Sequence, residues 1–171
     1  MEVGLAESVG RAMRLDRCSS LPNALLHGLA LHLVAEFGHL YPMWNVNTAV
    51  EELAQDSGKG LPLHLVAVEN DRAIGIVSVI ADDEVTGWEG KGWWLANVFV
   101  LPEFRGRGVG TSLIDRAAEI ARESGALDLH LVTDTFENWY SKHDWQRAGV
   151  GEVHGNEMVV MHRKLGTNAQ T

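Results

Sequence analysis

A glycine-rich turn between a strand pattern and a helix pattern restricts the fold more than any other feature of the sequence. Residues 93–100 are apolar on both faces, which predicts a strand that is buried on both sides. The turn Arg105-Gly106-Arg107-Gly108-Val109-Gly110 follows, and after it the apolar residues recur with helical spacing. A second strand pattern covers residues 127–132, so we expect two parallel strands joined by a right-handed crossover through the helix.

This turn has the chemistry of a phosphate cradle. A helix N-terminus leaves backbone N–H groups unpaired and carries partial positive charge, and glycines let a ligand approach closely. Arg105 and Arg107 add positive charge in a chain that is otherwise acidic, with 14 Lys+Arg against 23 Asp+Glu and a net charge of -9. A tight turn with solvent-exposed arginines is the structural alternative.

The even glycine spacing differs from the dinucleotide motif G-x-G-x-x-G, and no lysine follows Gly110 as a Walker A loop requires.

The rest of the chain predicts an α+β domain. We expect a strand over 11–18, a helix over 22–40 with Ser19 or Ser20 as N-cap, and a second helix over 48–55. A hairpin with strands 63–69 and 73–80, a short helix over 136–143, and strands 146–153 and 158–163 complete the pattern. We expect a flexible arm over 1–10, a single domain over 11–165 and a frayed tail over 166–171.

Composition excludes several classes of function. The single cysteine, Cys18, allows no intramolecular disulfide, which favours a cytoplasmic protein, and no motif surrounds it. We find no secretory signal and no apolar run long enough for a membrane span. The acidic balance argues against nucleic acid as a partner, whereas it is compatible with a cationic substrate.

The turn and the order of elements resemble those of the GCN5-related N-acetyltransferases, the GNAT superfamily. The hallmark of that family is Arg or Gln, then x-x-Gly-x-Gly/Ala after a strand, and Arg105-x-x-Gly108-x-Gly110 matches it. The resemblance covers residues 11–165 and implies a three-layer fold: a central mixed, twisted sheet in the order β-α-α-β-β-β-α-β-α-β-β with helices on both faces. It also implies acetyl-CoA as the acyl donor. Binding of its pyrophosphate and pantetheine arm is then expected at Val98, Phe99, Val100, Arg105, Gly106, Arg107, Gly108, Val109, Gly110 and Thr111.

A second match to the family implies a catalytic residue. The pattern aromatic-Tyr-x-x-x-x-aromatic is present as Trp139-Tyr140 and Trp145. The resemblance implies that Tyr140 protonates the leaving CoA thiolate, and a phenol with an ordinary pKa near 10 is protonated at neutral pH. A core tyrosine packed between two tryptophans is the structural alternative.

The acceptor and its base are less defined by the sequence. The backbone near Asn97 and Val98 is the expected oxyanion donor, and loop residues Trp44 and Trp88 are candidate pocket walls. The sequence does not rank the candidate bases, which are His64, Glu69, Asp82, Asp83, Glu84, His130 and Asp134. The expected partner is an amine-bearing substrate, a small molecule or a peptide N-terminus, and a cationic one would suit the acidic chain. Other acyl groups and a homodimer stay open.

Three other hypotheses fit parts of the sequence: an acyl-CoA sensor, a nucleotide-binding protein and a metal site. A non-catalytic acyl-CoA sensor would use the same turn but would not turn over, and a nucleotide-binding protein would prefer ATP or NAD. A metal site at His32, Glu36 and His39 would need more than a shared helical face, because these residues do not form His-Glu-x-x-His and no cysteine cluster accompanies them. We therefore expect no metal.

Overall fold

The computed structural model describes residues 12–56 and 60–166, so the expected N-terminal arm and nearly all of the expected C-terminal tail lie outside the described residues. The helices and strands follow the predicted order. They are β1 (Arg14–Arg17), α1 (Asn23–Phe37), α2 (Val46–Ala54), β2 (Leu63–Glu69), β3 (Arg72–Ile80), β4 (Trp94–Val100), α3 (Val109–Glu123), β5 (Asp128–Thr133), α4 (Glu137–Ser141), β6 (Gln146–Val153) and β7 (Asn156–Lys164). Single 3₁₀ turns lie at Cys18–Ser20, Gly38–Leu40 and Pro102–Phe104.

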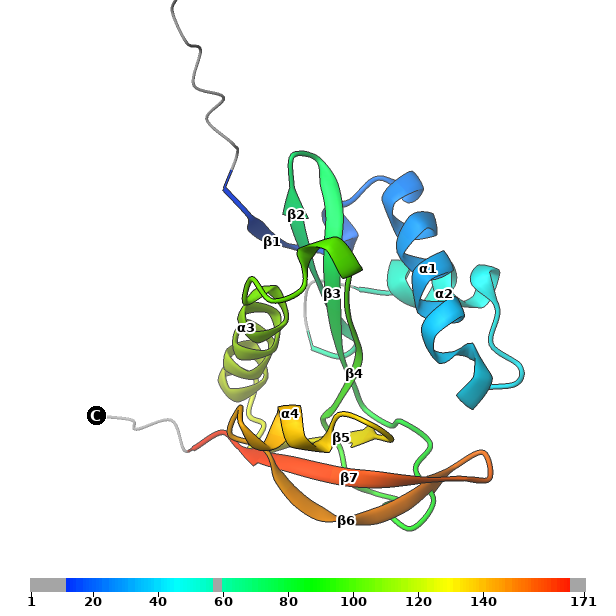
Figure 1. Ribbon diagram of the computed structural model, residues 1–171, viewed down its shortest axis with the longest axis vertical. Coiled ribbons are helices and arrows are strands. Elements are labelled where there is room, and N and C mark those ends of the chain that lie inside the picture. Colours follow the sequence, from blue (N-terminus) through cyan, green and yellow to red (C-terminus); the bar gives the residue numbers. More distant parts are fainter. Residues whose placement is uncertain (1–11, 57–59, 167–171) are drawn as a thin grey trace, which may run out of the picture.

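The strands form one mixed sheet in the order β1-β2-β3-β4-β5-β7-β6. Among the strands that the structure describes, only the β4–β5 pair is parallel, as the crossover through α3 requires. Helices α1 and α2 lie on one side of β2–β4 and α3 lies on the other (Figure 1). These findings confirm the predicted mixed sheet with helices on both faces.

Local sequence explains the packing of the first half of the sheet. The β2–β3 turn places Asn70 and Asp71 at φ 51° and 60°, a left-handed conformation that these two residue types tolerate. Helix α3 buries one apolar face, while Asp115, Arg116 and Glu119 are exposed on the other. Gly75 on β3 permits this close approach, because an added Cβ would lie 3.1 Å from a Leu113 methyl group.

The N-cap of α1 and the start of α2 differ from the sequence prediction. Ser19 and Ser20 do not cap α1, because both belong to the 3₁₀ turn, where the Ser20 hydroxyl donates to the Arg17 carbonyl at 2.8 Å. Pro22 occupies the N-cap position instead, without a side-chain cap. Helix α2 begins two residues early, at Val46, because Asn45 forms a capping box with Thr48.

The two parallel strands separate soon after they meet. The register joins β4 and β5 only at Trp94 and His130, and the His130 amide donates to the Trp93 carbonyl at 3.0 Å. Beyond this point β5 runs across the view while β4 continues upward (Figure 1). Asn97 has φ 55°, and the β3–β4 register shifts at the same place, which marks a β-bulge. The separation leaves the edge of β4 open next to the start of α3.

Nothing in the described ranges resembles a transmembrane helix: no helix there combines the length and the apolar composition that a bilayer span needs.

Candidate active site

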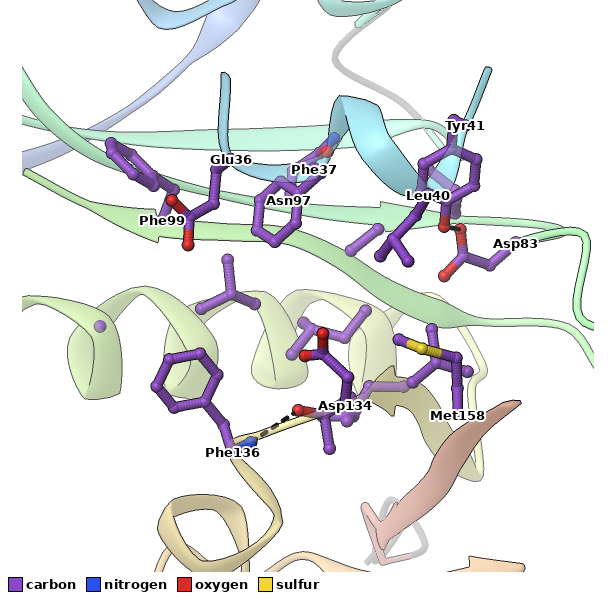
Figure 2. A pocket seen from close by; sticks show the side chains of 18 of the residues that line it. Glu36, Phe37, Leu40, Tyr41, Asp83, Asn97, Phe99, Asp134, Phe136 and Met158 are labelled. Carbon is purple, nitrogen blue, oxygen red and sulfur yellow. Dashed lines mark hydrogen bonds between the residues drawn. The ribbon is translucent and has the colours of Figure 1, made fainter. Parts of the chain in front are cut away.

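A large cavity opens where β4 and β5 separate. Its volume is about 1370 Å³, and it is lined by the C-terminal end of α1, by α2, β4, the start of α3, the end of β5 and α4. Figure 2 shows Phe37 of α1, Asn97 of β4 and Asp134 after β5 around the same space. All of the expected cofactor-binding residues except Arg107 line it, and so does Tyr140. Residues from widely separated parts of the sequence therefore meet at one site.

The glycine-rich turn forms one end of the cavity. Gly108 is the N-cap of α3 and has φ 77°, in the left-handed region that favours glycine. A Cβ added at Gly106 or Gly108 would meet no atom within 4 Å, so both positions face open space. The first turn of a helix has no intrahelical acceptors for its N–H groups, so this end of the cavity presents unpaired donors and positive helix-dipole charge.

The two arginines of the turn have different positions. Arg105 lines the cavity; its Nε donates to the Val100 carbonyl at 2.9 Å and its guanidinium lies 5.6 Å from the Phe99 ring centre. The Arg107 guanidinium lies 5.2 Å from the ring centre of Phe104 and is not among the cavity-lining groups. Arg105 is therefore the arginine fixed next to the cradle.

Tyr140 both packs in the core and reaches the cavity. Its side chain is 8% exposed, and its ring contacts Trp139 and Trp145 at centroid distances of 5.1 and 6.0 Å. The hydroxyl makes no hydrogen bond with any described residue. Burial raises the pKa of the Tyr140 phenol above its ordinary value, so the hydroxyl keeps its proton at neutral pH. The two sequence interpretations of Tyr140 are thus compatible with each other.

The structure separates the candidate bases. His64, Asp82, Asp83, Glu84 and Asp134 line the cavity, whereas Glu69 and His130 do not. Glu69 ends β2 beside the hairpin turn. The His130 ring packs between Trp88 and Trp94, with centroids at 5.9 and 5.3 Å, and burial lowers its pKa.

Asp83 differs from the other acidic residues of the cavity because it is buried, at 8% exposure. The Tyr41 hydroxyl donates to its Oδ1 at 3.1 Å. Burial raises the pKa of the Asp83 carboxyl to about 7; the bond from Tyr41 opposes this rise, and the charges of Glu84 and Asp82 add to it. Sequence reasoning missed Tyr41, because nothing in the chain pattern places it beside a loop more than forty residues away.

A buried polar chain that runs from Asn97 through Ser78 to His64 supports the β4 bulge. The Asn97 amide donates to Ser78 Oγ at 3.0 Å, and Ser78 Oγ lies 2.7 Å from His64 Nδ1. His64 Nε2 lies 3.1 Å from the Glu52 carbonyl, which only accepts, so Nε2 carries the proton and Nδ1 accepts from Ser78. Burial lowers the pKa of His64, in agreement with a neutral ring. Asn97 lines the cavity, and no described residue donates a hydrogen bond to its side-chain oxygen.

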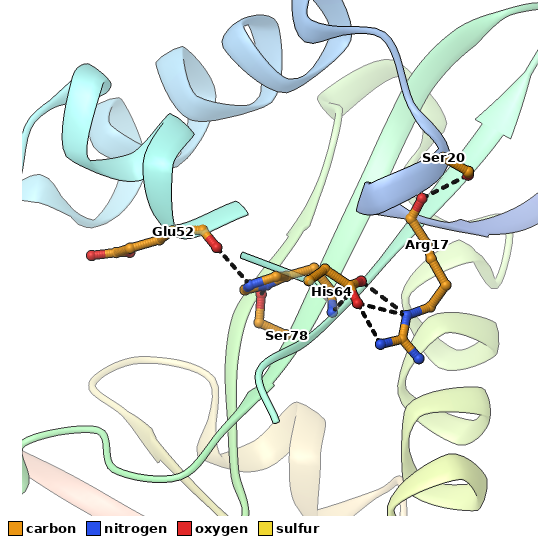
Figure 3. Close-up of polar contacts among 6 residues, drawn as sticks. Arg17, Ser20, Glu52, His64 and Ser78 are labelled. Carbon is orange, nitrogen blue, oxygen red and sulfur yellow. Dashed lines mark hydrogen bonds and ion pairs between the residues drawn. The ribbon is translucent and has the colours of Figure 1, made fainter. Parts of the chain in front are cut away.

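The second buried carboxylate of the described chain, Asp56, is paired differently. Arg17 donates to both of its oxygens, and the His64 amide donates to it at 3.2 Å (Figure 3). Asp56 does not line the cavity, so it serves to fix the start of β2 against β1.

The tryptophan predictions were half right. Trp44 lines the cavity, and its Nε1 donates to Glu52 at 3.1 Å. Trp88 does not; its Nε1 donates to the Val150 carbonyl, and its ring packs where Gly149 and Gly151 leave room. In the described part of the chain, no group of three or more His, Cys, Asp or Glu residues could hold a metal ion.

Comparison with known proteins places the chain in a family. The model of the Acetyltransferase (GNAT) family matches residues 29–150, which is more than half of the chain. The chain belongs to the GNAT family. The open β4 edge, the glycine turn and α3 all lie within the matched GNAT region, so the chain carries an acetyltransferase domain.

Solved structures confirm the GNAT fold. A GNAT-family acetyltransferase from Staphylococcus aureus Mu50 is similar with a TM-score of 0.67 and 13% identity, covering 91% of this chain and 100% of that one. PaiA N-acetyltransferase from Thermoplasma acidophilum, in complex with coenzyme A, has a TM-score of 0.63 and 13% identity, covering 90% of this chain and 99% of that one.

Sequence similarity to curated acetyltransferases is local. Thialysine N-epsilon-acetyltransferase from Bos taurus is 39% identical over 45 residues, which is 26% of this chain and 26% of that protein. The match spans about a quarter of the length of these curated relatives.

Proposed function

We propose that the protein is an N-acetyltransferase that transfers an acetyl group from acetyl-CoA to a primary amine by direct attack. One observation carries this proposal: a single cavity joins the open edge of β4, the N-terminus of α3 and the Tyr140 hydroxyl. The β4 edge can bind an extended chain, the N-terminus of α3 can bind phosphates, and the Tyr140 hydroxyl can donate a proton. We also propose a cytoplasmic location, since the single Cys18 needs no oxidising compartment.

The chain's own residues fit the donor. Beyond the bulge, the backbone of Val98, Phe99 and Val100 no longer pairs with β5, so it can bind an extended amide-containing arm as an added strand. Gly106 and Gly108 face open space, so a pyrophosphate can approach the backbone N–H groups from Gly106 to Thr111. The Arg105 N–H donates to the Pro102 carbonyl at 3.3 Å, so Arg105 would act through its side chain. The Thermoplasma acidophilum relative, solved with coenzyme A, supports the choice of ligand.

Three groups would act on the reaction. A backbone N–H near Asn97 and Val98 would stabilise the negative charge that develops on the carbonyl oxygen. Tyr140 would donate its proton to the departing thiolate, because its hydroxyl is protonated and makes no other hydrogen bond in the described chain. The apolar wall that Tyr140 shares with Trp139 would limit access of water.

A primary amine is the acceptor that the acidic cavity favours. The relatives named thialysine N-epsilon-acetyltransferase also act on an amine, which supports this class. A small molecule and a peptide N-terminus both fit a cavity of about 1370 Å³.

The test is turnover. Purified protein with acetyl-CoA and a panel of amines should release free thiol, and acetyl-CoA, but not ATP or NAD, should raise the melting temperature. Stabilisation by acetyl-CoA without thiol release from any acceptor would support the acyl-CoA sensor instead. Stabilisation by ATP or NAD alone would contradict both.

A further inference from the structure

The lining of the cavity is strongly acidic. Six lining side chains are carboxylates: Glu36, Glu52, Asp82, Asp83, Glu84 and Asp134. Arg105 is the one Lys or Arg among the described lining residues, and it lies at the cofactor end. A ligand that enters the remaining space therefore meets negative potential, which attracts cations.

Asp83 is the buried member of this group and has no cation beside it. The structure's other buried carboxylate, Asp56, is neutralised by Arg17, whereas no ion pair to Asp83 forms within the described residues. Its only hydrogen-bond partner there is Tyr41, on Oδ1. Figure 2 shows the other oxygen pointing away from Tyr41, toward the side of the cavity where Met158 lies. Burying a carboxylate without a cation costs free energy. The position of Asp83 therefore suits a ligand that brings a positive charge.

The walls around Asp83 suit an alkyl chain. Leu40, Ile80 and Met158 line the cavity and belong to the second apolar cluster of the core. The Tyr41 ring contacts Trp44 and His154 at centroid distances of 6.1 and 5.6 Å, and all three line the same space. Aromatic faces and apolar walls beside a carboxylate fit an ammonium group on a hydrocarbon chain.

We propose that Asp83 binds the ammonium group of a cationic alkylamine acceptor and takes one of its protons. This inference rests on the proposed function, to which it adds the base and the acceptor class. Tyr41 is a positioning residue, because its hydroxyl holds one carboxylate oxygen and leaves the other for the ammonium group. The acidic mouth formed by Asp82, Glu84 and Asp134 favours an acceptor with a second positive charge.

The proton transfers balance. An alkylamine enters as an ammonium ion with three N–H bonds. Asp83 takes one proton, and the freed lone pair forms the new C–N bond to the acetyl carbonyl carbon. As the C–S bond breaks, its electron pair leaves on sulfur, the thiolate takes the Tyr140 proton, and the nitrogen returns a second proton to the Tyr140 oxygen. The amide product keeps one N–H, and Asp83 releases its proton to solvent.

The pH dependence follows from the groups around Asp83. Its pKa of about 7 predicts that kcat/KM falls below pH 7, because protonated Asp83 can neither bind the cation nor accept a proton. Tyr41, Asp82, Glu84, Glu52 and His154 also face this region. Tyr41 does not ionise in this range, because burial and the Asp83 charge raise its pKa.

The experiment compares Asp83→Asn with the wild type. The change keeps the acceptor for Tyr41 and removes the charge, and Asp115→Asn on the exposed face of α3 is the matched control. With 1,4-diaminobutane as acceptor, we expect kcat/KM to fall by about 10²- to 10⁴-fold and the loss of rate below pH 7 to disappear in Asp83→Asn only. The KM for acetyl-CoA should change less than about twofold, because Asp83 lies away from the cradle.

A second measurement separates the two proposals. Calorimetric titration of the diamine into the CoA-saturated protein should show binding at least tenfold weaker in Asp83→Asn, and 4-aminobutyrate should be a poorer acceptor than the diamine. Wild-type turnover that Asp83→Asn retains within about threefold, with the same pH profile, would overturn the role of Asp83 while the proposed function stands. No wild-type thiol release with any amine would overturn the proposed function, and the proton transfer with it.

Discussion

Two residues of this site, Tyr140 and Asp83, are buried in the protein and also face the cavity. Tyr140 is a core residue at 8% exposure, yet its hydroxyl reaches the cavity without a hydrogen bond in the described chain. Asp83 has the same exposure, yet it has no cation in the described chain and faces the same space. A buried carboxylate is normally paired with a cation, and a phenol in the core normally has a hydrogen-bond partner, so both residues are candidates for function.

The Tyr140 phenol is expected to affect the rate more than the fold. Tyr140→Phe keeps the ring contacts with Trp139 and Trp145 and removes only the hydroxyl, which has no hydrogen-bond partner among the described residues. We expect kcat to fall by about 10²-fold while the melting temperature changes little. Steady-state kinetics with saturating acetyl-CoA measures this effect. An unchanged turnover number and pH profile would remove the role of general acid.

Asp83 is expected to lower stability at high pH. Folding raises its pKa from about 3.9 in the unfolded chain to about 7, so the folded protein favours the protonated form. Its contribution to the free energy of unfolding is therefore present below pH 4 and is lost as the pH rises toward 7. Since a tenfold change in proton affinity is about 1.4 kcal/mol, the loss is at most about 4 kcal/mol.

Asp83→Asn should remove the part of the pH dependence of stability that comes from ionisation of Asp83. We expect the variant to be more stable than the wild type at pH 8 and similar to it at pH 4, as measured by urea unfolding at each pH. Two parallel curves of stability against pH would contradict the buried, raised pKa of Asp83.

At the scale of elements, local patterns predicted most of the fold. Helix α3, the β2–β3 hairpin and the β4-turn-α3 unit follow from periodicity and turn residues that are adjacent in sequence. The serine N-cap of α1 was wrong because Ser20 bonds its own turn, and the Trp88 wall was wrong because two glycines far along the chain provide its packing site. The β4–β5 separation and the Tyr41–Asp83 pair depend on tertiary contacts, which no local pattern encodes.

The start of α3 provides a prediction with an internal control. Gly108→Ala places a Cβ at φ 77° and toward open space, so we expect a loss of about 1 kcal/mol in stability and a several-fold higher KM for acetyl-CoA. Gly110→Ala adds a Cβ at an ordinary 3.7 Å from a Val100 methyl group and should leave both quantities nearly unchanged. Thermal unfolding and kinetics measure the pair. Equal effects of the two substitutions would contradict a specific requirement at Gly108.

At the scale of the whole molecule, charge is divided between the two ends of one cavity. The chain has a net charge of -9, and Arg105 stands at the cradle while carboxylates line the acceptor end. This division would keep the anionic donor and a cationic acceptor apart until their reactive groups meet between them. The acidic composition, which at first only argued against nucleic acid, thus becomes an argument about the acceptor.

Raising the ionic strength should therefore lower kcat/KM more for a doubly charged cationic acceptor than for a zwitterionic one. The Debye length shortens from about 10 Å at 0.1 M salt to about 3 Å at 1 M, so the attraction of the exposed carboxylates at the mouth is screened. For 1,4-diaminobutane we expect kcat/KM to fall several-fold between about 0.05 and 0.5 M salt. The zwitterion 4-aminobutyrate serves as the matched acceptor and should change much less. If both acceptors respond equally at saturating acetyl-CoA, the acidic mouth does not select the acceptor, and the apolar walls around Asp83 alone must do so.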